Sequence, residues 1–156
     1  QSLVDKDSGT IVRQMLRRKE LAAKLVLPVD LVIKRKGRAL VVRPEEVGAA
    51  DMILDIGPET IRIFSGHIKK AKTLLWNGPM GKFEEKSYSH GTLAVGSLIA
   101  SRASGLAYGV VGGGETVSAL EKTGLAQYVD WVSTGGGAML SYIGGAKMPG
   151  LKGIIK

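Results

Sequence analysis

Two stretches of the chain place three consecutive glycines between an apolar run and a helix-like segment. They are VVGGGETV, with Gly112, Gly113 and Gly114, and VSTGGGAML, with Gly135, Gly136 and Gly137. Glycine loses more backbone freedom on folding than any other residue, so such runs are costly unless a turn or a ligand requires them. The start of a helix presents unpaired N–H groups and partial positive charge, which bind phosphate. A phosphate can approach glycine closely because no Cβ stands in the way.

A third apolar run ends in Asn77, Gly78 and Pro79. In open parallel sheets, ligands bind at the carboxyl ends of the strands, which is where these turns are expected. Two such turns from neighbouring strands would hold a polyphosphate or a transferring phosphoryl group from two sides. One glycine turn alone is equally well explained as a tight strand-to-helix connection. Together the three turns predict phosphate binding. The P-loop pattern and the G-x-G-x-x-G dinucleotide pattern are both absent.

Two carboxylates near these turns have more than one interpretation. Glu115 follows the first glycine run, where it would be a Mg²⁺ ligand beside substrate phosphates or only a partner of the helix dipole. Glu84 would accept hydrogen bonds from ribose hydroxyls or lie on a solvated surface. His67 and His90 have no second His or Cys at ligand spacing. We therefore assign the histidines no catalytic role.

Strand-like apolar runs alternate with helix-like amphipathic segments, and this order predicts the elements that position the turns. Strands are expected at 25–27, 52–56, 73–76, 106–111 and 131–133, with Pro58 and Glu59 in the first turn of a helix. Such alternation is typical of an α/β fold with a parallel sheet and helices on both faces, a Rossmann-like three-layer arrangement. Residues 31–33 and 39–42 flank a basic turn and predict a hairpin-like excursion.

Composition narrows the class of protein. The 156 residues are 44% hydrophobic and carry a net charge of +8, yet only 5% are aromatic. The charge indicates either a solvated basic face or attraction of anions such as phosphate esters. A base-stacking surface for nucleic acid is not expected, because aromatic residues are so few. The chain has no cysteine, which excludes disulfides and zinc–thiolate sites and fits a reducing cytoplasm. No apolar run is long enough to predict a membrane helix.

Six ordered motifs resemble one known family. WNGPMGKFE, VVGGGETV and VSTGGGAML resemble the C-terminal signatures of phosphoglycerate kinase, and LPVDLVI, LDIGPETI and MPGLKGI match that family's order and spacing. The resemblance covers nearly the whole chain. It implies a glycolytic transferase, monomeric and cytoplasmic, with two α/β domains facing each other across a cleft. The implied reaction moves phosphoryl from 1,3-bisphosphoglycerate to MgADP and gives 3-phosphoglycerate and MgATP.

The resemblance also implies a role for each matching residue in binding ADP or ATP. Asn77 and Thr116 would contact phosphates, and Gly112, Gly113 and Gly114 would lie near the phosphates of the nucleotide. Pro79 would lie by the nucleotide, Glu84 would bind the ribose, and Glu115 would hold Mg²⁺. Gly135, Gly136 and Gly137 would stabilise the transferring phosphoryl group. The last three glycines are the implied catalytic residues.

Departures from the family pattern leave alternatives open. Glu115 replaces the usual metal-binding Asp, Lys82 replaces an apolar residue against the base, and Ile53 replaces a Gly near the adenine. Residues 1–156 match part of the C-terminal nucleotide domain. The N-terminal substrate domain, through which the glycerate would bind, is absent, so the chain alone is expected to be inactive. The alternatives are a degenerate nucleotide-binding or scaffold module without turnover and, on charge alone, a nucleic-acid-binding protein.

Overall fold

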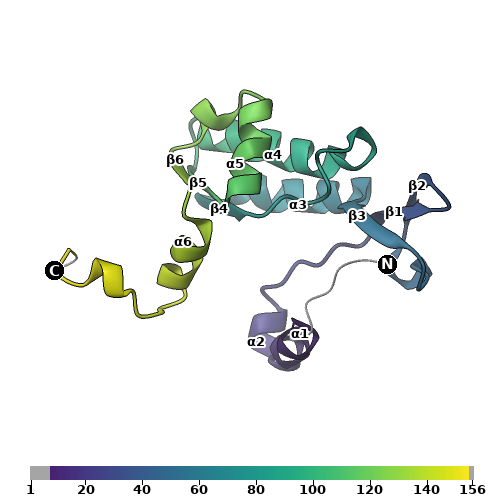
Figure 1. Cartoon of the computed structure of the whole chain (residues 1–156), viewed down its shortest axis with the longest axis horizontal. Coiled ribbons are helices and arrows are strands. Elements are labelled where there is room, and N and C mark those ends of the chain that lie inside the picture. The colour runs from purple at the N-terminus through teal and green to yellow at the C-terminus, as the bar shows by residue number, and fades with distance from the viewer. Residues whose placement is uncertain (1–7, 155–156) are drawn as a thin grey trace.

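The computed structural model describes residues 8–154, which form two three-stranded sheets with helices around them (Figure 1). The first half contains α1 (Ser8–Arg17), α2 (Lys19–Ala22), β1 (Leu31–Arg35), β2 (Arg38–Val42), β3 (Met52–Ile56) and α3 (Pro58–Lys70). The second half contains β4 (Thr73–Asn77), α4 (His90–Ala103), β5 (Tyr108–Gly112), α5 (Gly114–Lys122), β6 (Trp131–Ser133) and α6 (Gly136–Ile143). Within these residues, every helix is too short or too polar to cross a bilayer.

The second half confirms the predicted α/β fold with a parallel sheet. Its strand order is β4-β5-β6, with both pairs parallel. The register places Asn77 opposite Gly112, and Gly112 opposite Ser133. The ends of all three strands therefore lie side by side, and each strand is followed there by a turn toward a helix.

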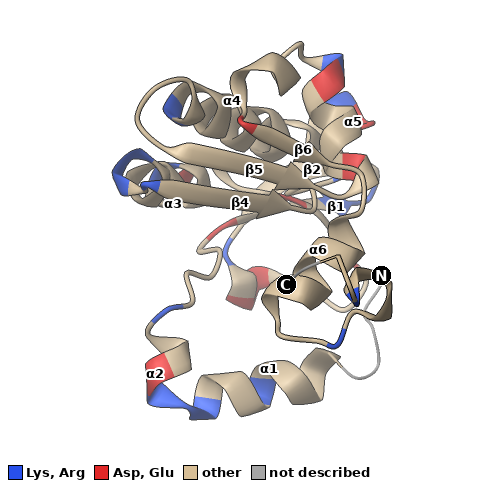
Figure 2. Ribbon diagram, turned by 90° about the vertical axis from the view of Figure 1, so that its left-hand side faces the viewer, with Lys and Arg blue, Asp and Glu red and all other residues tan. Residues whose placement is uncertain are grey.

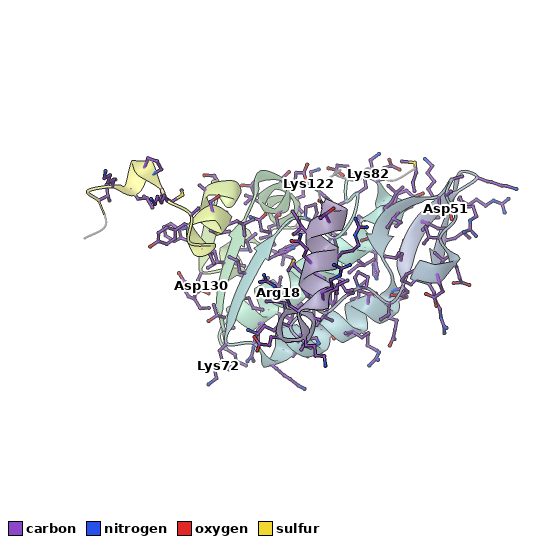
Figure 3. The ribbon with its side chains drawn as sticks, turned by 90° about the horizontal axis from the view of Figure 1, so that it is seen from below. Arg18, Asp51, Lys72, Lys82, Lys122 and Asp130 are labelled. Atoms are coloured by element: carbon purple, nitrogen blue, oxygen red, sulfur yellow. The ribbon has the colours of Figure 1, made fainter. Side chains whose placement is uncertain are left out.

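The core lies between one face of this sheet and α3, α4 and α5. Trp76 and Val111 point from the strands into a cluster with Ile68, Ile99 and Leu120. Because side chains alternate along a strand, their neighbours point to the opposite face. The helices α1 and α2 lie on that opposite side (Figures 2 and 3), but neither contains a buried residue.

The other sheet is antiparallel, with strand order β2-β1-β3. The predicted hairpin is confirmed, and its turn places Lys36 and Gly37 at φ 49° and 78°, as a two-residue hairpin loop of type I′ requires. Arg35 donates two hydrogen bonds to Asp51, of 2.9 and 2.6 Å, which join β1 to the start of β3.

Two sequence expectations about strands are corrected. Residues 52–56 do form β3, but β3 pairs antiparallel with β1 instead of joining the parallel sheet. Its apolar pattern fits either sheet, and the hairpin beside it supplies the partner. Residues 25–27 form no strand, because no neighbouring strand among residues 8–154 pairs with them.

The start of α3 is capped by a distant carboxylate. Asp30 accepts hydrogen bonds from the backbone N–H groups of Glu59 and Thr60, at 3.0 and 2.8 Å, and from the Thr60 hydroxyl at 2.6 Å. The Gly57 N–H in turn donates to the Asp30 carbonyl at 2.9 Å. This exchange satisfies the free N–H groups of the first helical turn and fixes α3 against the antiparallel sheet.

A second buried carboxylate, Asp55, joins β3 to α4. It accepts hydrogen bonds from the N–H of Gly91 at 2.8 Å and from the N–H of Ile56 at 2.9 Å. The loop after β4 is tied to the same strand, since the Lys82 N–H donates to the Leu54 carbonyl at 2.8 Å. Asp55 therefore links the antiparallel sheet to α4, which packs against the parallel sheet.

The two carboxylates are expected to give stability opposite pH dependences. Burial raises the pKa of Asp30, but hydrogen bonds from Thr60 and Glu59 outweigh it and bring the pKa below its ordinary 3.8. Burial raises the pKa of Asp55 above 3.8, because hydrogen bonds from Gly91 and Ile56 offset only part of it. The contribution of Asp30 is present above 3.8 and is lost as pH falls through the lowered pKa. The contribution of Asp55 is present below 3.8 and is lost as pH rises through the raised pKa.

We therefore expect the stability deficit of Asp30→Asn to grow as pH rises from about 3 to 6, and that of Asp55→Asn to shrink. Thermal melts of both variants and the unchanged chain across this pH range would measure the deficit in stability. In a chain of this size, each kcal/mol shifts the melting temperature by about 2–4 °C. Parallel trends in the two variants would contradict the assignment.

Candidate functional site

The turns after β4, β5 and β6 meet in close contact. A Cβ added to Gly136 would lie against the backbone N of Gly113, 2.6 Å from its Cα, and 2.7 Å from Nδ2 of Asn77. Gly113 has φ +90°, a conformation that L side chains rarely adopt, and it precedes α5. The sequence predicted that Asn77 and the two glycine runs share one site, and the structure brings these residues together.

Two helix starts open to solvent at this point. Gly114 and Glu115 begin α5 and are exposed, and at the start of α6 Gly136 is buried while Gly135 and Gly137 are exposed. A Cβ added to Gly114 or Gly137 would meet no atom within 4 Å. The first turns of two helices, whose N–H groups have no acceptor within the helix, therefore begin close together and partly exposed, which is suited to a multiply charged anion.

Thr116 holds the first turn in place. Its side chain is fully buried, and its Oγ1 accepts a 2.7 Å hydrogen bond from the Gly78 N–H. Gly78 has φ +96°, so the turn that carries Asn77 and Pro79 is fixed to α5 in an unusual backbone conformation. The phosphate contact implied for Thr116 stays a prediction, because the structure shows its hydroxyl serving this internal bond.

A pocket of about 420 Å³ lies between β3 and the loop that follows β4. It is lined by Met52, Ile53, Leu54, Asp55, Met80, Gly81 and Lys82. The loop is held over the pocket by Thr92, whose Oγ1 accepts hydrogen bonds from the N–H groups of Met80 and Gly81 at 3.1 and 3.2 Å. Half-buried Pro79 precedes this wall. Two of the residues that depart from the family pattern, Ile53 and Lys82, therefore line one pocket.

The far part of this loop carries charge. Lys82 forms an ion pair with Glu85, and this hydrogen bond is the main reason that the pKa of Lys82 lies above its usual range. Glu84 is exposed and adds to the same upward shift. The Lys122 ammonium lies 5.0 Å from the ring centre of Phe83, so α5 also contacts the loop.

The sequence analysis missed residues that position the site. Thr92 holds the loop after β4, Asp55 holds the start of α4, and Met139 packs its methyl group against Gly112 at the end of β5. Only the acidic residue inside the apolar run of β3 was a usable signal, since an Asp there must be paired when buried. Among residues 8–154 no three His, Cys, Asp or Glu side chains are grouped to hold a metal.

Comparison with known proteins agrees with this geometry. The sequence model of the family described as phosphoglycerate kinase matches residues 1–146. The chain belongs to the phosphoglycerate kinase family. A phosphoglycerate kinase from Chloroflexus aurantiacus is 42% identical over 155 residues, which are 96% of this chain and 39% of that protein. The chain thus spans about two fifths of the length of the phosphoglycerate kinases it matches.

Solved phosphoglycerate kinases share the fold. The structure from Coxiella burnetii superposes with a TM-score of 0.85 at 33% identity and covers 97% of this chain and 40% of that one. The structure from Pyrococcus horikoshii gives a TM-score of 0.71 at 27% identity and covers 94% of this chain and 37% of that one. These neighbours confirm the α/β fold and the family.

The close contact at Gly136 gives a matched test of the turn geometry. We expect Gly136→Ala to lower the melting temperature by several degrees, because its methyl group would overlap the Gly113 backbone, which has little room to move. Gly137→Ala adds the same methyl group one residue later into open space, so its melting temperature should be unchanged or slightly raised. Equal melting temperatures for the two variants would contradict the contact.

The Thr116 hydroxyl gives a second test. Thr116→Val keeps the shape of the side chain but leaves the Gly78 N–H without its acceptor, at a cost of about 1–3 kcal/mol. Thr116→Ser retains the hydroxyl and should recover most of that loss. Urea unfolding of the three proteins would measure it, and faster amide exchange at Gly78 should accompany the loss in Thr116→Val alone.

Proposed function

We propose that this chain supplies the nucleotide side of phosphoglycerate kinase activity, the reversible phosphoryl transfer from 1,3-bisphosphoglycerate to ADP that gives 3-phosphoglycerate and ATP in glycolysis. One observation carries the proposal: the turns after three parallel strands converge at two open helix starts. Membership of the family supports it. Because the chain spans about two fifths of its relatives, the glycerate substrate would bind through a domain outside this sequence, and we expect no turnover by the chain alone.

The two helix starts would divide the phosphates between them. Gly112, Gly113 and Gly114 lead into α5 and would receive the phosphates of ADP or ATP. Gly135, Gly136 and Gly137 lead into α6 and would stabilise the phosphoryl group in transfer. The amide of Asn77 lies between the two turns and offers a further donor. Fixed N–H donors of this kind stabilise charge that develops on phosphoryl oxygens without rearranging during the reaction.

Glu115 would provide the carboxylate for a Mg²⁺ ion that accompanies the nucleotide. It is exposed in the first turn of α5, beside the proposed phosphate site. Mg²⁺ is usually held by one or two carboxylates together with substrate phosphates, so a single protein ligand fits a cation that arrives with ADP. When bound, the cation would neutralise phosphate charge. The same exposed position also fits a helix-dipole partner, so the residue needs a direct test.

The pocket beside β3 would take the nucleoside. Ile53 and Lys82 form part of its wall, and Pro79 adjoins the loop above it. Glu84 is exposed on the same loop and would reach the ribose hydroxyls. A cytoplasmic location belongs to this proposal and is supported by the absence of cysteine.

A thermal melt with millimolar MgADP tests nucleotide binding by the chain. A ligand that binds only the folded state raises stability by about 2.7 kcal/mol at one hundred times its Kd, so the melting temperature should rise. In Glu115→Gln, ADP should shift the melting temperature by the same amount with and without Mg²⁺. In Glu115→Asp, the part of the shift that depends on Mg²⁺ should remain. Glu121→Gln, at the other end of α5, is the matched control and should behave as the unchanged chain.

Three outcomes would count against parts of this proposal. No shift in the unchanged chain would argue against a formed nucleotide site. If Mg²⁺ still raises the melting temperature of Glu115→Gln as much as that of the unchanged chain, Glu115 is not the metal ligand. A chain that binds MgADP but gives no turnover when the remainder of a relative is supplied would favour a nucleotide-binding module without catalysis.

A further inference from the structure

The pocket beside β3 has a wall that is mostly apolar. Met52, Ile53, Leu54 and Met80 contribute hydrocarbon and thioether groups, and Gly81 contributes no side chain. Met52 and Ile53 are 39% and 41% exposed, so the wall offers a flat ring an accessible apolar surface. Apolar walls of this kind give a ligand affinity, whereas the few polar groups beside them decide which ligand fits. The polar side chains of the pocket therefore determine which base it takes.

Asp55 is the acidic residue of the lining, but its carboxylate is already engaged. It is 2% exposed, and its two oxygens accept hydrogen bonds from the N–H groups of Ile56 and Gly91, at 2.9 and 2.8 Å. A Cβ added to Gly81 would lie 2.6 Å from the Asp55 Cγ, so the loop after β4 covers the carboxylate. The amino group of a base therefore finds no acceptor at Asp55.

Lys82 is the basic residue of the lining, and its side chain is accessible. Its backbone N–H donates to the Leu54 carbonyl at 2.8 Å, which fixes the residue to the β3 wall. Its side chain is 52% exposed, and the ammonium donates a hydrogen bond to Glu85, a residue outside the pocket lining. An ammonium has three N–H donors and no acceptor. The ion pair therefore restrains the Lys82 side chain and leaves it further donors for a ligand.

We propose that Lys82 selects the base of the nucleotide, so that the chain binds a nucleoside diphosphate with a 6-oxopurine base, guanine or hypoxanthine, more tightly than ADP. This inference rests on the proposed function, which places the nucleoside in this pocket. A 6-oxopurine presents O6 and N7 side by side as acceptors, whereas adenine has an amino donor in place of O6. A group that only donates satisfies both acceptors of a 6-oxopurine but meets a second donor on adenine.

Titration calorimetry of the full chain with MgADP, MgIDP and MgGDP tests the preference. The Kd values for MgIDP and MgGDP should each be about fivefold lower than that for MgADP, which is the lower end of the discrimination that contacts to a base edge give. The lower end is expected because the Lys82 side chain is half exposed to water. Hypoxanthine lacks the 2-amino group of guanine, so similar values for MgIDP and MgGDP would assign the preference to the O6 and N7 edge.

Two substitutions on the same loop locate the selecting group. Lys82→Met keeps an unbranched side chain but removes the donors, so it should raise the Kd values for MgIDP and MgGDP about fivefold and leave that for MgADP nearly unchanged. Lys86→Met removes the same charge at an exposed position outside the pocket lining, so it is the matched control and should keep the preference. Both variants should melt as the unchanged chain does, because the ion pair of Lys82 with Glu85 is exposed and such pairs add little stability.

The results separate this inference from the proposed function. Equal binding of the three nucleotides, or tighter binding of MgADP, would overturn the role of Lys82 and leave the proposed function standing. A preference for 6-oxopurines that persists in Lys82→Met, or that is lost equally in Lys86→Met, would also overturn that role. No binding of any of the three nucleotides would contradict the proposed function itself, and this inference with it.

Discussion

The site depends on one steric constraint, the contact among three strand-to-helix turns. The parallel register brings Asn77, Gly112 and Ser133 side by side, but register alone leaves the helices free to begin at a distance. The missing Cβ of Gly136 lets α6 begin against the Gly113 backbone and the Asn77 amide. Two helix starts then lie close together, so their partial positive charges add in one small region, as the proposed phosphate site requires. A larger residue would separate them, and each helix would be left with an ordinary, isolated N-terminus.

Two buried carboxylates connect this arrangement to the antiparallel sheet. Asp30 fixes α3, and Asp55 fixes the start of α4 to β3, so the loop after β4 is held between two anchored elements. The raised pKa of Asp55 shows that its burial is only partly compensated by hydrogen bonds. An apolar residue there would remove this penalty but would leave the Gly91 N–H without its acceptor. Burying the Asp55 carboxylate therefore costs stability, but its hydrogen bonds fix the position of the pocket wall that would face the nucleoside.

Local sequence patterns predicted most of the parallel half and the meeting of its three turns. Glycine runs after apolar strands and the Pro58 helix start depend on neighbours along the chain, so they could be predicted without knowing the fold. The partner of β3 could not, because its alternating pattern is satisfied by either sheet and only the hairpin beside it decides. The anchoring roles of Asp55 and Thr92 join segments that are distant in sequence. The identity of the bound nucleotide came from the resemblance and stays a prediction.

The failure of residues 25–27 to form a strand has the same physical origin as the unpaired edge of β4 among residues 8–154. An apolar segment becomes a strand only when a neighbour accepts its hydrogen bonds, and within residues 8–154 β4 likewise has no partner on the side away from β5. Asn77 stands at the end of that edge strand. Its amide, which lies between the two helix starts, is therefore held from one side only, by the pairing of β4 with β5 and by the hydrogen bond from Gly78 to Thr116. A strand added to β4 would restrict Asn77 from the other side.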